Sequence, residues 1–325
     1  MIPGRFRLSI GTAVFFLAAG MLFGVMVARG APIYSDVVLG ENPVAYWRLN
    51  ETGGTTAIDE RASFPGTYEV SAGGTPIALA DPGPRPADGF LGLEATNFGP
   101  TFPGGNNGTN IATQVSGFHY GGDYPFTVEA WFRTTERVEA QNILTLSNED
   151  SGNLLWGLGL KDQEVGDGSG STVRAYAYNG SFFDVRTTEG GTGSSGGTMK
   201  DFDDGQWHYA AGVFSHDTTN EDGDGSTDYK IALYVDPTTT LPVATGFHSR
   251  SFSSTVNGTN IGSLVRHGGD IQSEFDGQID EAAVYDYALT GEQVLSHYRA
   301  ATTPEPSAVL LLALGLIGLL SLRPR

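Results

Sequence analysis

Hydrophobic and polar positions alternate along the central part of the chain as they do in β-strands. In the segment Phe126–Arg133, the residues Phe126, Val128, Ala130 and Phe132 fall on one face, because side chains two positions apart point the same way in an extended strand. We therefore expect Phe126, Val128 and Phe132 to lie in a core between two sheets. Further segments have the composition of strands, some of them apolar on both faces as in covered strands: Val44–Leu49, Ile143–Ser147, Leu154–Leu160, Thr172–Tyr178, Trp207–Phe214, Tyr229–Val235 and Gln278–Tyr285.

Asn-Gly pairs separate several of these segments. Such pairs, at Asn107, Asn179 and Asn257, favour the positive φ angles of tight turns. The pentapeptide Asn-Gly-Thr-Asn-Ile occurs at both Asn107–Ile111 and Asn257–Ile261. We interpret the two copies as equivalent entries from a turn into a strand, one on each sheet. Many short strands with such turns predict an all-β sandwich of two antiparallel sheets.

One segment near the C-terminal end has the pattern of a helix. Thr290-Gly-Glu-Gln293 has the spacing of a capping box. Val294, Leu295 and Tyr298 then fall on one helical face. The sequence therefore predicts a single short helix at the end of a sandwich that extends from Asp36 to Ala300.

The composition supports a β-sandwich and excludes several classes of protein. The 325 residues include 46 Gly and 16 Pro, which disfavour helix interiors, and the hydrophobic fraction of 39% is enough for a core. The absence of cysteine excludes disulfides, thiolate catalysis and cysteine-ligated zinc. The formal net charge of −19, from 37 acidic and 18 basic side chains, repels nucleic acid and anionic lipid and suits divalent cations or neutral polymers.

Residues 1–30 have the layout of a secretory signal peptide. Arg5 and Arg7 precede the apolar stretch Leu8–Ala28, and Ala28-Arg29-Gly30 places small residues at the two positions that a signal peptidase reads. The stretch is also long enough to span a bilayer, so a permanent anchor is the alternative. We expect cleavage.

The C-terminal end repeats this layout in reverse. Pro304-Glu305-Pro306 is followed by the apolar run Ala308–Leu320 and then by Arg323 and Arg325, which favour the cytoplasmic face of a membrane. These three parts resemble the PEP-CTERM sorting signal of Gram-negative bacteria. The resemblance implies transient membrane retention, processing by an exosortase-type enzyme, and association with the cell surface, the outer membrane or the extracellular matrix. The alternative is a plain C-terminal anchor, a second hydrophobic helix.

Four blocks in the body of the chain carry aromatic strand motifs: Asn42–Glu51, Phe126–Trp131, Gly205–Ala210 and Phe275–Glu281, which continues into Val284–Leu289. In this order they resemble the laminin G-like domains of the concanavalin A-like jelly-roll class. The resemblance implies one sandwich domain over residues 31–303, between the signal peptide and the sorting segment 304–325. It implies little about the ligand, because the blocks are core strands and function in such folds lies in loops.

Some sandwiches of this class are glycoside hydrolases, which carry Glu, Asp and Glu at alternate strand positions facing one cleft. The nearest match is Glu274, Asp276 and Gln278, where the glutamine has no acid or base function. Asp280 continues the face but lies two residues too far along. We interpret this segment as a solvent-facing edge and expect no enzymatic activity, with no catalytic residues. A divergent glycoside hydrolase is the alternative.

The loop Asp217–Asp228 is the strongest candidate for a metal site. Asn220, Asp222 and Asp224 place oxygen donors at alternate positions before a glycine, as at the start of a calcium loop, and Asp228 adds a further donor. The closing bidentate glutamate and the flanking helices of an EF-hand are missing. The sequence thus leaves two interpretations open: calcium as a cofactor, or a solvated acidic turn.

Aromatic and histidine side chains define no ligand site. The four tryptophans fall within strand segments, so we expect them in the core. The six histidines lack zinc-ligand spacing, and His208 is interpreted as a structural imidazole. We expect the hairpin around Asn179-Gly180 to pack its own aromatic side chains rather than present a platform for a sugar. These aromatic side chains are Tyr176, Tyr178, Phe182 and Phe183.

The sequence therefore predicts an exported binding module of the cell surface or extracellular matrix. Its expected partners are a polysaccharide or other surface polymer, a signal peptidase and an exosortase-type enzyme, with transient membrane association through the termini and no nucleic acid. Two alternatives remain open: the divergent hydrolase, and a structural or adhesion protein without a discrete ligand.

Overall fold

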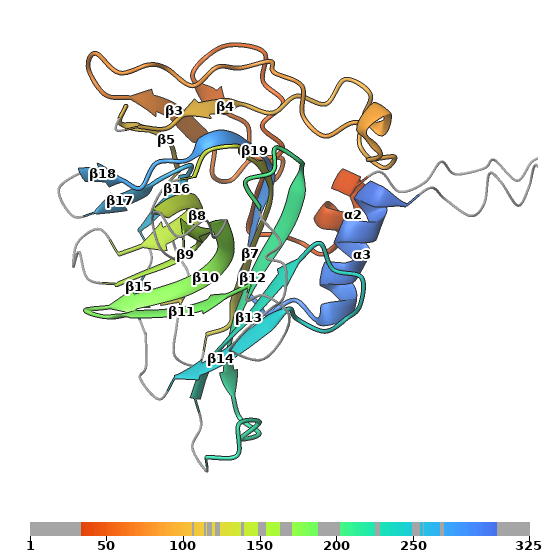
Figure 1. Cartoon of the computed structure of the whole chain (residues 1–325), viewed down its shortest axis with the longest axis vertical. Coiled ribbons are helices and arrows are strands. Elements are labelled where there is room, and N and C mark those ends of the chain that lie inside the picture. Colours follow the sequence, from red (N-terminus) through yellow and green to blue (C-terminus); the bar gives the residue numbers. More distant parts are fainter. Residues whose placement is uncertain are drawn as a thin grey trace, which may run out of the picture.

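Two antiparallel sheets pack face to face in the structure, a computed structural model of the chain (Figure 1). The structure describes residues 34–105, 107–113, 115, 119–120, 124–137, 140–148, 154–162, 171–187, 202–224, 228–248, 254–255, 257–266 and 270–303. The predicted signal peptide and sorting segment lie outside these residues. Among the helices within them, none has the length and hydropathy that crossing a membrane requires.

The first sheet has seven strands, in the order β1-β19-β7-β12-β13-β14, with β4 pairing with β19 outside this path. Every expected strand that belongs to it is present, within a few residues of its predicted ends. Its strands are β1 (Ala45–Trp47), β4 (Thr101–Pro103), β7 (Phe126–Arg133), β12 (His208–Asp217), β13 (Asp228–Val235), β14 (Ala244–His248) and β19 (Asp276–Tyr285).

The second sheet has eight strands, in the order β11-β10-β9-β8-β16-β5-β3-β2. These strands are β2 (Thr56–Ala57), β3 (Gly66–Val70), β5 (Thr109–Thr113), β8 (Ala140–Ser147), β9 (Leu154–Asp162), β10 (Ser171–Asn179), β11 (Phe182–Arg186) and β16 (Gly258–Ile261). Two small two-stranded sheets accompany it: β6 (His119–Tyr120) with β15 (Ser254–Thr255), and β17 (Leu264–Arg266) with β18 (Asp270–Gln272).

The main core lies between the two sheets, as the alternation in β7 predicts. Phe126, Val128 and Phe132 are all fully buried there. The ring of Phe126 stacks on Phe214 of the first sheet at 4.3 Å and meets Trp156 of the second sheet edge-on at 6.0 Å. The aromatic side chains therefore join the two layers directly, and the predicted sandwich is confirmed.

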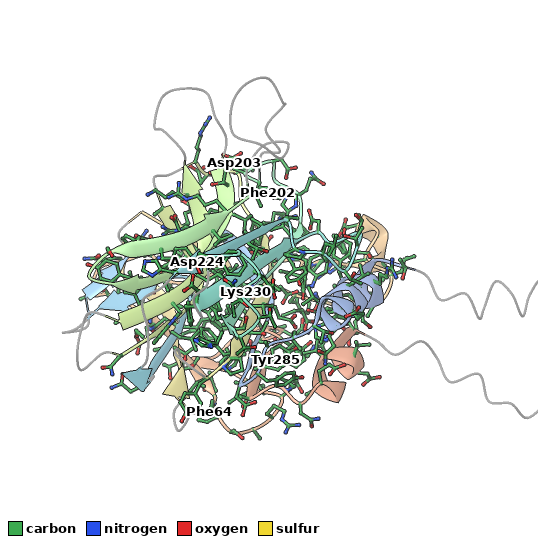
Figure 2. All side chains as sticks on the ribbon, turned by 90° about the horizontal axis from the view of Figure 1, so that it is seen from below. Phe64, Phe202, Asp203, Asp224, Lys230 and Tyr285 are labelled. Atoms are coloured by element: carbon green, nitrogen blue, oxygen red, sulfur yellow. The ribbon has the colours of Figure 1, made fainter. Side chains whose placement is uncertain are left out.

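A second apolar layer covers the outer face of the first sheet. Helix α3 (Gly291–Thr302) begins at the predicted capping box, where Thr290 and Gln293 bond each other's backbone reciprocally. Its residues Val294 and Leu295 are buried, and Tyr298 stacks on Trp131 at 5.8 Å. Figure 2 shows Tyr285 on the side of the molecule where the helices lie. The sheet is thus covered on both faces, which explains why several of its strands carry apolar side chains on both faces.

A second helix, α2 (Tyr34–Gly40), lies beside α3 and was not predicted from the sequence. Gly92 connects the two helices: its carbonyl accepts the N–H of Tyr34 at 2.9 Å, and its N–H donates to the carbonyl of Ala301 at 3.0 Å. A Cβ atom at Gly92 would lie 1.6 Å from the carbonyl oxygen of Ala300, so only glycine fits. The described chain therefore begins and ends side by side. The 3₁₀-helix η1 (Pro86–Asp88) lies nearby in sequence.

The two pentapeptides lie in one sheet, not on opposite sheets as the sequence suggested. Ile111 of β5 pairs directly with Ile261 of β16, and Asn110 donates to Asn260 at 3.0 Å. The two copies are thus antiparallel neighbours. The prediction was wrong because similar local entry into a strand does not determine which strand becomes the partner.

A β-bulge near the middle of β19 exchanges the two faces of this strand. Before it, Ile279 points into the main core, and after it Ala282 and Val284 do so. Glu281 sits at the bulge with φ +53°, a left-handed conformation that costs energy for a residue with a side chain. The bulge lets Tyr285 join the layer beneath the helices.

Candidate functional site

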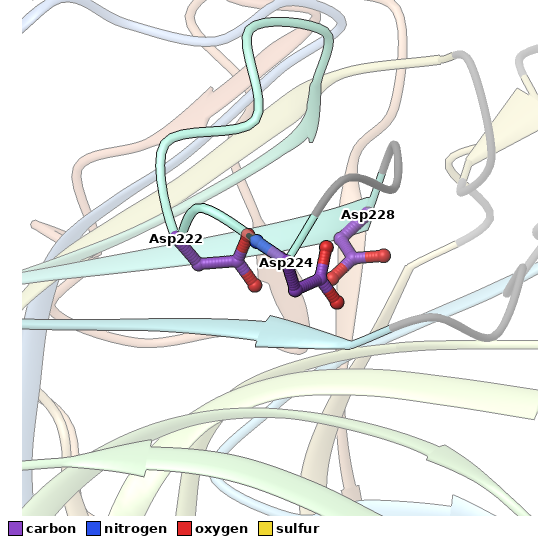
Figure 3. A group of neighbouring side chains, drawn as sticks. All are labelled: Asp222, Asp224 and Asp228. Carbon is purple, nitrogen blue, oxygen red and sulfur yellow. Dashed lines mark hydrogen bonds between the residues drawn. The ribbon is translucent and has the colours of Figure 1, made fainter.

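The acidic loop between β12 and β13 brings three carboxyl groups together. One carboxylate oxygen from each of Asp222, Asp224 and Asp228 lies within 4.8 Å of the others (Figure 3). Asp222 and Asp224 are exposed, whereas Asp228 begins β13 and is buried. Asn220, the other predicted donor, adopts φ +56° in the turn, and its carbonyl accepts the N–H of Gly223 at 3.1 Å.

The geometry of these carboxylates fits the requirements of calcium. Calcium takes oxygen ligands at about 2.3–2.6 Å, so two ligand atoms on opposite sides of the ion lie at most about 5 Å apart. The start of the loop is fixed by Asp217, whose carboxylate accepts the N–H groups of Thr219 at 2.9 Å and Glu221 at 2.7 Å. Glu221 in turn pairs with Lys230 at 2.5 Å. The three aspartates would hold the ion, with water and backbone carbonyls as further ligands.

The segment compared with a hydrolase triad is hydrogen-bonded into the sandwich. Glu274 is buried, and its carboxylate accepts the N–H of Gly108 at 3.0 Å and the hydroxyl of Thr109 at 3.2 Å. Asp276 is partly exposed, and burial together with the negative charge of Glu136 raises the pKa of its carboxyl. The prediction of a solvent-facing edge is therefore wrong for Glu274, because its carboxylate is hydrogen-bonded to residues at the start of β5.

Gln278 occupies the third position of this comparison and is also buried. Its amide Nε2 donates to the carbonyls of Gly99 at 3.0 Å and Pro82 at 3.3 Å, while its Oε1 accepts from Arg133. An ionised carboxylate has no hydrogen to donate to these carbonyls, so glutamine suits this position and glutamate does not. The amide at this position is thus a structural group, and the expected solvent exposure is wrong here as well.

Three of the four aromatic side chains of the β10–β11 hairpin pack on one another, as expected, whereas Phe183 lies against the main core and meets His248 edge-on at 4.9 Å. Phe182 lies 4.7 Å from Tyr178 and 5.8 Å from Tyr176. The hydroxyl of Tyr176 donates to Asn142 at 2.7 Å, and its ring lies against Gly157, where a Cβ would approach it to 2.5 Å. Phe182 remains 50% exposed at the rim of this cluster. The ring of Phe182 is therefore accessible to solvent beside the buried Tyr176.

His208 is a structural imidazole, as the sequence indicated. Its Nδ1 lies 2.8 Å from a carboxylate oxygen of Asp236, and its Nε2 lies 3.1 Å from one of Asp204. Burial lowers the pKa of His208, but the two carboxylates outweigh this effect and raise the pKa above its ordinary value.

A buried carboxylate that the sequence did not single out links the first sheet to α3. Glu129 of β7 accepts hydrogen bonds from the hydroxyls of Tyr209 at 2.5 Å and Tyr285 at 2.8 Å, and it lies 3.0 Å from Nδ1 of His297. Burial alone would raise the pKa of Glu129, but the charge and hydrogen bond of His297, with the two tyrosines, hold it below its ordinary value. Glu129 and His297 are both fully buried, so this group anchors the helix.

The bulge in β19 carries two neighbouring buried carboxyl groups, Asp280 and Glu281. Asp280 accepts from Asn97 at 2.6 Å, and Glu281 accepts from Tyr46 and pairs with Arg48 at 3.3 Å. Burial raises the pKa of Glu281 to about 7, although Arg48 and Tyr46 oppose the shift. Burial and the charge of Glu281 also raise the pKa of Asp280.

The raised pKa of Glu281 predicts a specific pH dependence of stability. Between the ordinary pKa of 4.5 and the folded value of about 7, the unfolded chain loses the proton while the folded chain keeps it, so the contribution of Glu281 to stability falls as pH rises. We expect Glu281→Gln, which does not titrate, to gain on the order of 2–3 kcal/mol relative to the wild type over this pH range. Denaturant unfolding at a series of pH values measures the difference, and a difference that is constant with pH contradicts the prediction.

Comparison with known protein families identifies two segments of the chain. A family model described as the concanavalin A-like lectin/glucanases superfamily matches residues 104–295. A second model, of the PEP-CTERM protein-sorting motif, matches residues 302–325. This motif directs export and association with the cell surface in Gram-negative bacteria, and it implies processing by an exosortase. No curated protein sequence matches the chain.

Solved structures share the fold of this chain at low sequence identity. Domain 4 of AbnA, a GH43 extracellular arabinanase from Geobacillus stearothermophilus solved with arabinotriose, has 18% sequence identity and a TM-score of 0.50, over 79% of this chain and 98% of that domain. The binding domain of Paraclostridial Mosquitocidal Protein 1 has 14% identity and a TM-score of 0.49, over 81% of this chain and 53% of that one. At these identities the likeness concerns the fold alone.

Proposed function

Because this chain belongs to the concanavalin A-like lectin/glucanase superfamily, we propose that it is an exported module that binds carbohydrate or another polymer at the cell surface without cleaving it. The observation that carries the proposal is the position of Gln278. Hydrolysis by this class of sandwich needs a pair of competent carboxyl groups. Here the amide of Gln278, at the third position of the motif, donates to two backbone carbonyls. The buried Glu274 accepts three hydrogen bonds from Gly108 and Thr109 at the start of β5.

A carbohydrate array probed with the full-length chain in mild detergent tests this proposal. We expect retention on at least one class of polysaccharide and no release of sugar from β-glucans or galactans. Reproducible sugar release that is lost in Glu274→Gln would establish the hydrolase instead. A uniformly blank array together with self-association or cell binding would favour a structural or adhesion protein without a discrete ligand.

We further propose that Asp222, Asp224 and Asp228, with Asn220, form a calcium site that shapes this loop. Calcium bound only by the folded protein should raise its stability by about 2.7 kcal/mol at a concentration one hundred times the dissociation constant. Thermal unfolding with calcium and with EDTA measures this increase. We expect Asp224→Asn to abolish it, and the exposed Asp88→Asn to retain it.

The behaviour without calcium separates a metal site from a structural turn. In EDTA, Asp224→Asn should be at least as stable as the wild type, because the substitution removes one of three clustered negative charges. If calcium stabilises neither protein, or if it stabilises the variant equally, the acidic turn is only a solvated loop.

The sorting motif predicts how the chain reaches its place of action. Processing near Pro304-Glu305-Pro306 would separate the sandwich from the apolar segment and release it to the cell surface or matrix. We predict that mature protein from the native host lacks Leu310–Arg325, as well as residues 1–30. Intact-mass measurement checks this, and a mature species that still ends at Arg325 would indicate a permanent anchor.

A further inference from the structure

Two arginines face each other across the β10–β11 hairpin. Arg174 and Arg186 are direct partners in the antiparallel register. Their neighbours Val173, Ala175 and Val185 belong to the main core, so both arginines extend from the outer face of the second sheet. Like charges directly opposite each other destabilise a strand pair. The pairing is unusual in a chain with only 18 basic side chains against 37 acidic ones.

Among the described residues, only Arg186 of these two arginines forms an ion pair. Arg186 forms an ion pair with Asp184 at 2.5 Å. Arg174 is 95% buried, and its guanidinium lies over the ring of Tyr176 at 4.3 Å and that of Phe182 at 5.7 Å. Within the described part of the chain Arg174 has no ion pair, and its buried Nε has no hydrogen-bond partner.

A buried guanidinium nitrogen without an acceptor, here the Nε of Arg174, is costly. Stacking on aromatic rings stabilises a cation by less than the loss of its hydration costs. Burial lowers the pKa of Arg174, and the positive charge of Arg186 adds to this effect, although Tyr176 and the negative charge of Asp184 oppose it. An anion placed against both guanidinium groups would supply acceptors to Arg174 and weaken the repulsion between the two arginines.

We propose that Arg174 anchors a binding site for a carboxylated saccharide on the outer face of β10. The planar fork of an arginine binds a carboxylate through two parallel hydrogen bonds. Phe182, half-exposed beside Arg174, offers an apolar ring face to the sugar, backed by Tyr178 at 4.7 Å. The proposal rests on the carbohydrate-binding function and specifies its ligand class.

The surroundings favour a single acidic sugar over a general polyanion surface. Lys161 of β9 lies on the same outer face, diagonal to Arg174 at about 7–8 Å between the backbones, and can meet a second polar group of the ligand. The chain as a whole carries a formal charge of −19 and repels polyanions at long range. Recognition must therefore come from short-range contacts at the arginine.

Titration with short oligosaccharides tests the site. The full-length chain in mild detergent is titrated with trigalacturonate, with neutral galactotriose and with a sulfated galactose trimer, at about 150 mM salt to screen long-range repulsion. We expect the carboxylated trimer to bind most tightly. Arg174→Met should weaken its binding by about tenfold or more, and Arg174→Lys by a similar factor because lysine lacks the fork. Arg61→Gln, at an exposed position away from the hairpin, is the charge-matched control and should bind as the wild type does.

Unfolding of the same variants distinguishes binding from a structural role. Arg174→Met removes a like-charge pair and an unsatisfied buried group, so we expect its unfolding midpoint to match or exceed that of the wild type. A lowered midpoint would show that the arginine serves the fold, and would overturn the proposal.

The outcomes separate this site from the general function. Unchanged affinity for trigalacturonate in Arg174→Met, a preference for the sulfated trimer, or binding of the neutral trimer alone overturns the carboxylate site and leaves carbohydrate binding in place. A chain that binds none of the trimers and no polysaccharide of the array overturns both.

Discussion

Truncation of Phe132 to alanine should lower the free energy of unfolding by about 3–5 kcal/mol, because it deletes a fully buried ring and leaves a cavity. Phe132 lies between the sheets, 6.4 Å from the ring of Phe275 and 5.6 Å from that of His208. Strand β7, which carries Phe132, pairs with β12 on one side and with β19 on the other. The backbone therefore has little freedom to close the cavity.

Urea denaturation of the purified chain measures the loss. Leu241→Ala provides the comparison, since Leu241 is 73% exposed and its truncation should change stability by less than about 0.5 kcal/mol. Equal midpoints for Phe132→Ala and the wild type would show that the ring is not in the core and that the assigned face of β7 is wrong.

Alternation along single strands predicted the sandwich because burial on one face is a local property of the sequence. Phe126, Val128 and Phe132 follow a strict period of two, and the capping box at Thr290 satisfies the helix start within four residues. Features of this kind depend on neighbours in the sequence. They could therefore be predicted without knowing which strands pair.

Features that depend on pairing between distant strands could not be predicted in this way. The bulge at Glu281 reverses the faces of β19, so Gln278 and Ala282 lie on opposite sides although they are four residues apart. The same limit explains why the repeated pentapeptides were assigned to different sheets. Helix α2 was missed because its seven residues carry little periodicity, and its position depends on Gly92.

The two candidate ligand sites also differ in whether they depend on local sequence or on the pairing of strands. The aspartates of the calcium loop are close in sequence, and their spacing predicted the cluster that the loop forms. Arg174 and Arg186 are separated by a turn, and their opposition appears only once the register of β10 and β11 is known. A sequence pattern gives no signal for a missing hydrogen-bond partner, which is the feature that points to a ligand at Arg174.

Replacement of Glu129 by alanine should destabilise the protein by about 3–5 kcal/mol, since it removes the shared partner of a buried histidine and two buried tyrosines. Tyr209, Tyr285 and His297 have no route to water, so each would keep an unsatisfied polar atom. Glu292→Ala, in the exposed first turn of α3, removes the same charge and should cost less than about 1 kcal/mol. An equal loss of stability in the two variants would mean that the buried hydrogen bonds of Glu129 add nothing to stability beyond the effect of its charge.

The pH dependence of Glu129→Gln identifies the ion pair within this network. The raised pKa of His297 gives a stabilisation that is complete below the ordinary value of 6.5 and is lost as pH rises through the folded pKa. The lowered pKa of Glu129 gives a second stabilisation, which is complete above pH 4.5, the ordinary pKa of glutamate, and is lost as pH falls through the folded pKa of Glu129. The wild type should therefore exceed Glu129→Gln in stability most between pH 4.5 and 6.5, and the excess should shrink on both sides. A difference that does not change with pH would mean that His297 is neutral in the folded protein and that α3 is held by hydrogen bonds and apolar contacts alone.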